Sequence, residues 1–317
     1  MGNNKFDRED AETLRRWEER KEELRAMVVD TRKLARAQIN ALGDNYRQVD
    51  PGILFPSDQW GQLKFHEKRW LEVEAAAMTC RGGVLVGRSA ARKYGMWVVS
   101  RTRETVEVGL PSRSNSPSRR RSGAYTFRYS ALEKSDVLRF EGQLVTNPIR
   151  TFIDIARYHG FVEGLIAADY LLRRGKSRAE IETAVRRMRR CKGIATVRRC
   201  LEHAIATSQS PYESLARALL IDAGLTSVVA QFEIDGRYVD LCVDGWLLIE
   251  IDGDMKYDGP DGEQAWRAEM KRQKRIGNKG YRFLRYPPEF IRDDPERFVN
   301  EVKEALESRD LLHARIG

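Results

Sequence analysis

Three acidic residues lie within or directly after apolar runs in the last third of the chain. Asp240 stands within VDLCV, and Glu250 and Asp252 stand in LLIEID. A carboxylate in a central strand is costly unless it is exposed, paired or bound to a metal. Glu250 and Asp252 are two residues apart and therefore share one face of their strand. Glu213, on the helix predicted before these strands, is a fourth candidate for the same site.

The loop between the two strands decides whether these carboxylates can meet. The Asp-Gly pair at 244–245 is a strong hairpin signal. A two-residue loop would turn Glu250 to the face opposite Asp240. A three-residue loop at 244–246 would place the two residues directly opposite, and one at 243–245 with a glycine bulge would place them diagonally. Opposite residues have Cβ atoms about 4.5–5.5 Å apart, which suits joint coordination of Mg²⁺ or Mn²⁺. We therefore predict an odd-length loop and a shared metal.

The same residues also have ordinary structural explanations. The SPYE run that ends at Glu213 is a capping box with proline at the first helical position. Asp252 and the glycine after it could form a turn, and Asp240 could be a solvated residue of an edge strand. The basic residues near the candidate site could equally be surface charges: Lys256, Lys271 and Arg272.

The elements that must position these carboxylates follow from periodicity and turn residues. A helix is predicted over 211–223, then three strands in VVAQFEI, RYVDLCV and WLLIEID, with Asp-Gly pairs between them. A helix over about 262–278, the strand YRFLRY and a closing helix over about 289–308 complete the order αβββαβα. The expected class is therefore α/β or α+β for the segment 207–317.

The rest of the chain is expected to form two further parts. Residues 1–65 are predicted to hold a long charged helix over 7–41 and an irregular connection over 42–65. The narrow apolar stripe of the helix indicates docking on another element or a coiled coil, and hence a surface for a protein partner or self-association. Residues 66–206 are predicted to be a mixed α/β and helical region. A length of 317 residues agrees with such a multi-domain chain.

Charge is distributed unevenly along the chain. The net charge of +9 divides into 0 for residues 1–50, +14 for residues 51–208 and −5 for residues 209–317. There is no apolar run of 18 residues, which argues against a membrane partner, and the N-terminus lacks the apolar core of a secretory signal. The four cysteines have no metal-binding spacing. Reduced thiols and a cytoplasmic location are the simplest expectation.

Within the basic middle, residues 173–199 contain 11 Arg or Lys and two acids. A helix predicted over 177–190 would place three of the arginines on one face, which could neutralise phosphates of DNA. A solvated helix face is the alternative, and no aromatic residues alternate with the arginines to stack on bases. The predicted nucleic-acid-binding residues are Arg173, Arg174, Arg186, Arg187 and Arg190.

The C-terminal third resembles a known family. SPYESLARALLIDAGL, QFEIDGRYVDLCVDGWLLIEIDGDMKY and EMKRQKRIGNKGYRFLRY together are similar to the Vsr-like domain-of-unknown-function 559 family of the PD-(D/E)xK nuclease superfamily, over about residues 207–306. The resemblance implies a three-layer restriction-endonuclease-like core with a mixed sheet. It also implies metal-binding acidic positions at Glu213, Asp240 and Glu250.

Two positions depart from the superfamily pattern. Asp252 occupies the place of the motif lysine, and Lys256 stands where relatives often carry histidine. In the catalytic interpretation Glu213 completes the metal shell and Asp252 positions a metal-bound water. Lys256 or Arg272 would stabilise negative charge that develops on the phosphate.

The middle region resembles a second group. VLVGRSAARKYGM, TVEVGLP and LVTNPIRTFIDIARYHGFVEGLIAADYLLRRG are similar to AbiEi-type antitoxins and transcriptional regulators, although the winged helix usual in front of them is not evident from residues 1–50. The leading hypothesis is a Mg²⁺-dependent DNA endonuclease, with a role in phage defence or mobile-element conflict implied by resemblance alone. The alternative is a non-catalytic nucleic-acid-binding antitoxin or regulator that keeps a degenerate nuclease fold.

Overall fold

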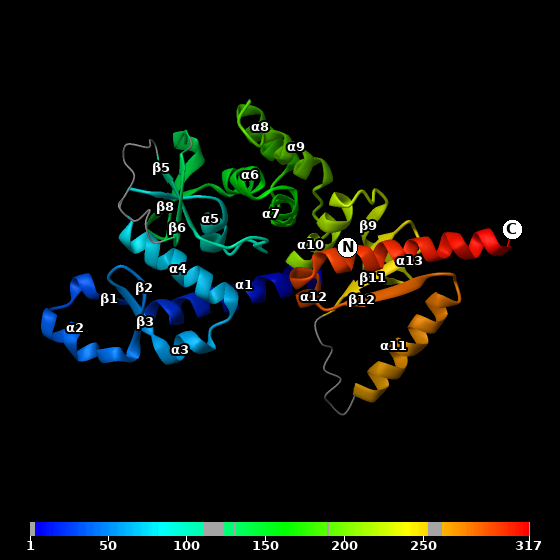
Figure 1. The fold of residues 1–317 in the computed structure, drawn as a ribbon, viewed down its shortest axis with the longest axis horizontal. Helices are drawn as coiled ribbons and strands as arrows, with labels where there is room; N and C mark the ends of the chain where they lie inside the picture. The colour runs from blue at the N-terminus through cyan, green and yellow to red at the C-terminus, as the bar shows by residue number, and fades with distance from the viewer. Residues whose placement is uncertain are drawn as a thin grey trace. The chain divides into compact units, whose positions relative to one another are not determined.

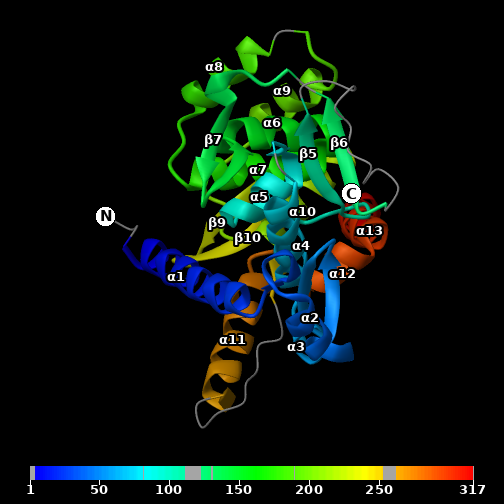
Figure 2. The same cartoon turned by 90° about the vertical axis from the view of Figure 1, so that its left-hand side faces the viewer.

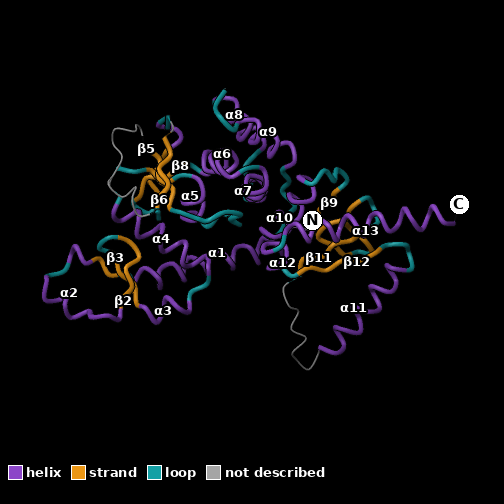
Figure 3. Tube along the Cα trace, in the orientation of Figure 1, coloured by secondary structure: helices purple, strands orange, loops and turns teal. Residues whose placement is uncertain are grey.

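A computed structural model describes residues 4–80, 82–110, 123–129, 131–188, 190–252 and 262–316. The described helices and strands form a mixed α/β protein with three separate sheets, which confirms the predicted class (Figures 1 and 3). The chain divides into two compact units, one formed by Met1–Trp97 and Thr102–Asp154 and the other by Val98–Arg101 and Ile155–Gly317. The predicted three-part division at 65/66 and 206/207 stays a prediction. Within the described ranges, no helix has both the length and the apolar character needed to cross a bilayer.

The N-terminal segment is more structured than predicted. Helix α1 (Asn4–Ala26) is followed by the short strand β1 (Val29–Asp30), helix α2 (Arg36–Leu42) and the hairpin of β2 (Tyr46–Asp50) and β3 (Ile53–Pro56). The expected single helix over 7–41 and the irregular connection over 42–65 are therefore wrong. The helix ends because Val29 and Asp30 pair with the hairpin strand β3 instead of continuing the helical ladder.

This small sheet has the strand order β1-β3-β2. Its elements follow one another as helix, strand, helix and hairpin, and only the 3₁₀ turn Gly43–Asn45 lies between α2 and the hairpin in this fully described stretch. A winged helix would have its recognition helix at that place, so this segment lacks the full element order of a winged helix. The apolar stripe of α1 is covered within its own unit, because Leu24 packs in a cluster with Phe55 and Trp70.

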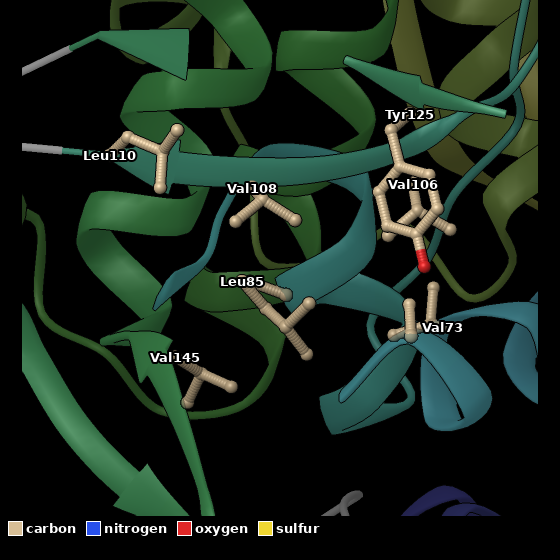
Figure 4. Close-up of a cluster of buried hydrophobic side chains, with 9 residues drawn as sticks. Val73, Leu85, Val106, Val108, Leu110, Tyr125 and Val145 are labelled. Atoms are coloured by element: carbon tan, nitrogen blue, oxygen red, sulfur yellow. The ribbon is translucent and has the colours of Figure 1, made fainter. Parts of the chain in front are cut away.

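The main core of the first unit lies against a five-stranded sheet of order β6-β5-β4-β8-β7. Figure 4 shows Val106, Val108 and Leu110 of one strand beside Leu85 of the adjacent strand, with Val145 on the next strand along the sheet. Every second residue of a strand points to the same face, so these three alternating residues contribute to one face, while Glu107 and Gly109 between them are buried as well. The elements are α3 (Ser57–Gln62), α4 (Phe65–Thr79), β4 (Val84–Leu85), α5 (Gly87–Tyr94), β5 (Val106–Leu110), β6 (Tyr125–Tyr129), β7 (Val137–Phe140) and β8 (Gln143–Thr146).

Helix α6 (Pro148–His159) crosses the boundary between the units, and the second unit continues with four helices and then a four-stranded sheet. The sheet has the order β12-β11-β10-β9, and only the β11–β12 pair is parallel. Figure 2 shows α11 from a second direction. The elements are α7 (Phe161–Arg173), α8 (Arg178–Arg187), α9 (Ile194–His203), α10 (Pro211–Asp222), β9 (Val228–Ile234), β10 (Arg237–Val243), β11 (Leu247–Ile251), α11 (Gly262–Gly277), β12 (Arg282–Tyr286), α12 (Pro288–Asp293) and α13 (Pro295–Ile316).

The order of elements from α10 onward is the predicted one, except that the closing helix is divided. Pro295 begins α13 directly after Asp294 caps α12, because proline fits the first turn of a helix but not its interior. Ile276 of α11 packs in one cluster with Cys242 and Leu248 of the sheet. Helix α11 therefore covers one face of the sheet, and α13 lies on the opposite side in Figure 1.

Candidate functional site

The hairpin between β10 and β11 sets the geometry of the site. Asp244 and Gly245 both have positive φ, 48° and 72°, as a type I′ turn requires. The Trp246 N–H donates to the Val243 carbonyl at 3.2 Å, yet the ladder pairs Val243 with Leu247. Trp246 is therefore an extra residue, and the predicted odd-length connection is confirmed.

This register places a row of polar residues across the sheet. Since Leu241 pairs with Ile249, the next position brings Asp240 opposite Glu250, which is the direct one of the two arrangements that an odd-length loop allowed. Glu250 is paired in turn with Arg285 of β12, and Gln231 of β9 lies opposite Asp240 between the pairs on either side. The four-residue row Gln231, Asp240, Glu250 and Arg285 is called the polar row below. The next row on the same face, two residues away, is apolar. Its members Cys242, Leu248 and Phe283 share a cluster with Ile276 of α11, whereas Val229 at the end of the row is 51% exposed.

Asp240 is the most strongly perturbed acid of the polar row. Burial is the largest cause of a pKa raised to about 7, and the charge of Glu213 is the second. Its Oδ2 accepts the Ile251 N–H at 2.7 Å, which favours the ionised form and limits the rise. Asp252 and Glu250 raise the same pKa. The four predicted acidic residues therefore interact electrostatically, as a shared site requires.

Glu213 has both a capping role and a place beside the polar row. Its N–H donates to Ser210 Oγ at 3.1 Å, which confirms the predicted N-cap. Its Oε2 accepts the Gln209 N–H at 2.9 Å and the Gln231 side-chain amide at 3.0 Å. Burial is the largest cause of its raised pKa. Gln231 has a φ of 51° within a strand, a conformation that costs about 1–3 kcal/mol, so backbone strain accompanies this contact.

Glu250 is held by two arginines. Arg272 of α11 places Nη2 2.6 Å from Oε1, and Arg285 of β12 forms an ion pair with Oε2. The predicted Arg272 thus reaches the site, where it also stacks over the Phe283 ring at 5.6 Å. Arg285 was not predicted. Its signal was available, because a charge within the strand YRFLRY requires the same explanation as Asp240 does.

The remaining predicted catalytic residues lie at the edge of what the structure describes. Asp252 is exposed just beyond β11 and lies close enough to influence Asp240. Lys256 lies outside the described residues. Lys271 is exposed on α11, in agreement with its alternative interpretation as a surface charge.

A buried ion pair fixes the helix that carries Glu213. Arg217 of α10 places Nη2 2.9 and 2.8 Å from the two carboxylate oxygens of Asp169 on α7. The same carboxylate accepts Ser214 Oγ and the Ile205 N–H, each at 2.8 Å. Both charges are almost fully buried, so removing one partner would leave the other uncompensated. The N-terminal turn of α10 is thereby anchored to the helices before it.

The carboxylates supply oxygen ligands of the kind that Mg²⁺ and Mn²⁺ prefer. Within the described parts of the chain, no three acidic, histidine or cysteine side chains are already grouped around one point that could hold an ion. Asp240 and Glu213 have raised pKa values, which a bound cation would reverse by favouring their ionised forms. Glu250 must exchange an arginine for the cation. The donor set therefore fits a divalent ion, provided that this exchange occurs.

The predicted arginines do not share one helical face. Helix α8 ends at Arg187, so Arg190 follows it in a turn rather than completing an i, i+4 set with Arg186. Beyond this turn the backbone at Gly193, with φ 83°, lies against Arg157: a Cβ there would be 2.9 Å from the Arg157 carbonyl oxygen. The expected helix over 177–190 is wrong in this respect.

We call the five predicted residues, Arg173, Arg174, Arg186, Arg187 and Arg190, the arginine cluster. Arg186 is 71% exposed and lies 3.9 Å from Glu182. Arg173 behaves differently, because it donates to the Ser208 carbonyl at 3.1 Å and its charge lowers the pKa of Glu213. One member of the cluster is therefore linked to the polar row, whereas Arg186, Arg187 and Arg190 are exposed to solvent.

Comparison with known proteins gives distant relatives. The uncharacterized protein MT2308 of Mycobacterium tuberculosis strain CDC 1551 / Oshkosh and the uncharacterized protein Rv2248 of strain H37Rv are each 28% identical over 177 residues. The match covers 53% of this chain and 64% of each relative, less than two thirds of their length. No family model matches the chain. No solved structure matches it either.

Proposed function

We propose that the protein is a Mg²⁺- or Mn²⁺-dependent DNA endonuclease of the Vsr-like type. The observation that carries the proposal is the register of the β10–β11 hairpin, which brings Asp240 opposite Glu250. Glu213 acts on the pKa of Asp240 from a neighbouring helix. Two of these acidic residues thus lie on neighbouring strands and the third acts on Asp240 from α10, in a protein whose middle segment is strongly basic.

Each side chain has a distinct task in this proposal. Asp240 and Glu250 hold the cation, and Glu213 orients the shell through its contact with Gln231. A divalent ion at this position would activate water and neutralise charge on the phosphate. Arg272 stays paired with Glu250, and its positive charge stabilises from there the negative charge that develops on the phosphate. The arginine cluster contacts the backbone of DNA.

The test is cleavage of supercoiled plasmid and of single-stranded DNA with Mg²⁺ or Mn²⁺, with EDTA as the blank. Asp240→Asn and Glu250→Gln are expected to reduce the rate by more than the roughly 10–100-fold typical of changes outside the metal shell. Asp244→Asn is the matched control, because it removes a carboxylate from the same hairpin and asparagine tolerates the φ of 48°. Cleavage that survives both site changes would remove the catalytic assignment.

A non-catalytic nucleic-acid-binding protein is the second candidate. It is favoured by the two arginines that already neutralise Glu250 and by Asp252 in the place of the motif lysine. In that case DNA binding is expected to persist in Asp240→Asn and to disappear when the arginine cluster is replaced. A cytoplasmic location, which follows from the cysteine pattern, and a role in phage defence or mobile-element conflict, which rests on the resemblances of the sequence, belong to both candidates.

A further inference from the structure

Glu250 has a cation partner for each of its carboxylate oxygens. Arg272 reaches Oε1 from α11, and Arg285 reaches Oε2 from β12. The side chains of Glu250 and Arg272 are only 10% and 9% exposed. A carboxylate that is neutralised twice in a buried place attracts a third cation weakly, since a divalent ion would meet the guanidinium charges at close range.

We propose that Arg285 occupies the cation's place at Glu250 and transfers to a nucleic-acid phosphate when the divalent cation binds. This inference rests on the proposed function and deepens it, because it makes cation and DNA binding depend on each other. A guanidinium pairs with phosphate through the same two-pronged geometry that it offers a carboxylate. The phosphate therefore releases Glu250 for the cation, and the cation releases Arg285 for the phosphate.

The two arginines differ in their freedom to leave. Arg272 is buried and stacks over the Phe283 ring at 5.6 Å. Arg285 is 31% exposed and belongs to β12, an edge strand of the sheet. Moving Arg285 exposes a side chain that solvent already reaches, whereas moving Arg272 would open the packing between α11 and the sheet. Arg285 is therefore the phosphate-binding partner, and Arg272 stays to position Glu250.

The same exchange predicts that the divalent cation and DNA each raise the protein's affinity for the other. Coupling free energies in proteins typically change an affinity by about 5–150-fold, and the effect is reciprocal. DNA is expected to raise the Mn²⁺ affinity of the wild-type protein by at least about fivefold. Removing the Arg285 charge is expected to raise the Mn²⁺ affinity without DNA, and to remove most of the further gain that DNA provides.

The experiment measures Mn²⁺ binding to the full-length protein from the electron paramagnetic resonance signal of free Mn²⁺. Titrations are made with and without a phosphorothioate duplex, which keeps the backbone charge and resists cleavage, and Mn²⁺ bound by the duplex alone is subtracted. Arg285→Gln is compared with Arg282→Gln, a matched control on the same strand whose guanidinium donates to Ser308 Oγ at 2.9 Å, away from Glu250. Circular dichroism confirms that each variant is folded, and Arg285→Lys tests whether a positive charge alone restores the competition.

Without DNA, Arg285→Gln is expected to bind Mn²⁺ more tightly than the wild type, and Arg282→Gln is expected to bind it with wild-type affinity. The duplex is expected to raise the Mn²⁺ affinity of the wild type but not that of Arg285→Gln. Metal-dependent cleavage together with equal or weaker Mn²⁺ binding by Arg285→Gln would overturn the exchange and leave the endonuclease intact. If Arg285→Gln did not fold, a wild-type Mn²⁺ affinity unchanged by the duplex would overturn the coupling. Absence of Mn²⁺ binding in every variant would overturn the proposed function and the exchange together.

Discussion

Asp240 is expected to make the stability of the second unit depend on pH. Its pKa rises from 3.8 to about 7 in the folded chain, first because of burial and then because of Glu213. Between these values the folded state binds more protons than the unfolded state, so stability falls as pH rises through this window. The contribution of Asp240 is fully present near pH 4 and is lost by about pH 8.

The size of the effect follows from the two pKa values. Each tenfold change in proton affinity is worth about 1.4 kcal/mol, so the difference between 3.8 and about 7 corresponds to about 4 kcal/mol. Asp240 is half-buried, and solvent reduces this figure to roughly 2–4 kcal/mol. The asparagine introduced by Asp240→Asn would stay neutral at every pH. Its side-chain oxygen can still accept the Ile251 N–H, which lies 2.7 Å from Asp240 Oδ2 in the wild-type structure. The variant is therefore expected to be more stable than the wild type near pH 8 and equal to it near pH 4.

Urea unfolding followed by circular dichroism at several pH values measures this difference. Because two units can unfold in separate transitions, hydrogen exchange of peptides from β10 and β11 assigns the change to the sheet. Asp244→Asn, in the same hairpin but exposed, is expected to follow the wild type. An Asp240→Asn protein that is less stable than the wild type near pH 8, or a difference that does not vary with pH, would refute the electrostatic reasoning.

Three further outcomes are expected for the second unit. Asp169→Asn leaves the buried guanidinium of Arg217 without its charged partner and is expected to cost about 3–5 kcal/mol in urea unfolding, whereas replacing both residues by apolar ones should recover much of that stability. Gly193→Ala is expected to lower the melting temperature more than Gly224→Ala: both have positive φ, 83° and 91°, but only Gly193 lies against the Arg157 backbone. Equal melting temperatures would remove the close approach as the cause. Replacing the exposed members of the arginine cluster by glutamine should weaken DNA binding in fluorescence anisotropy, and the slope of its salt dependence should fall by about one unit for each phosphate that the variant no longer neutralises; an unchanged slope would exclude the cluster from the interface.

The sequence predicts the candidate site where local rules fix the geometry. The Asp-Gly turn and the alternation of the flanking strands were sufficient to predict Asp240 and Glu250 on one face of the sheet, because hairpin register depends on a few adjacent residues. They left direct and diagonal pairing of the two residues open. Arg285 is joined to Glu250 through a parallel pair of strands. That register depends on how the 30 residues between them return to the sheet, which no local pattern specifies.

The N-terminal segment shows the opposite case. The charged helical pattern over 7–41 concealed β1, because a strand of two residues has too little periodicity to compete with its helical neighbours. The pairing of Val29 with Leu54 supplies the missing stabilisation from a residue far along the chain. The apolar stripe that indicated a protein partner is used within the unit instead, where Leu24 is fully buried. Tertiary contacts therefore decided both the length of the helix and what its apolar face packs against.

The polar row is the place where this sheet departs from the rules that stabilise a core. In the neighbouring row Cys242 and Leu248 are buried in one cluster with Ile276 of α11, so aliphatic residues in the polar row would satisfy packing at least as well. Instead the row contains Gln231 with a strained backbone, Asp240 with its pKa raised to about 7 and Glu250 between two arginines. Each feature costs stability, and they coincide at one level of one sheet. Several stability costs at one place are expected where side chains are arranged for chemistry rather than for packing. The polar row, more than the net charge of the chain, therefore indicates where on the protein an activity is expected.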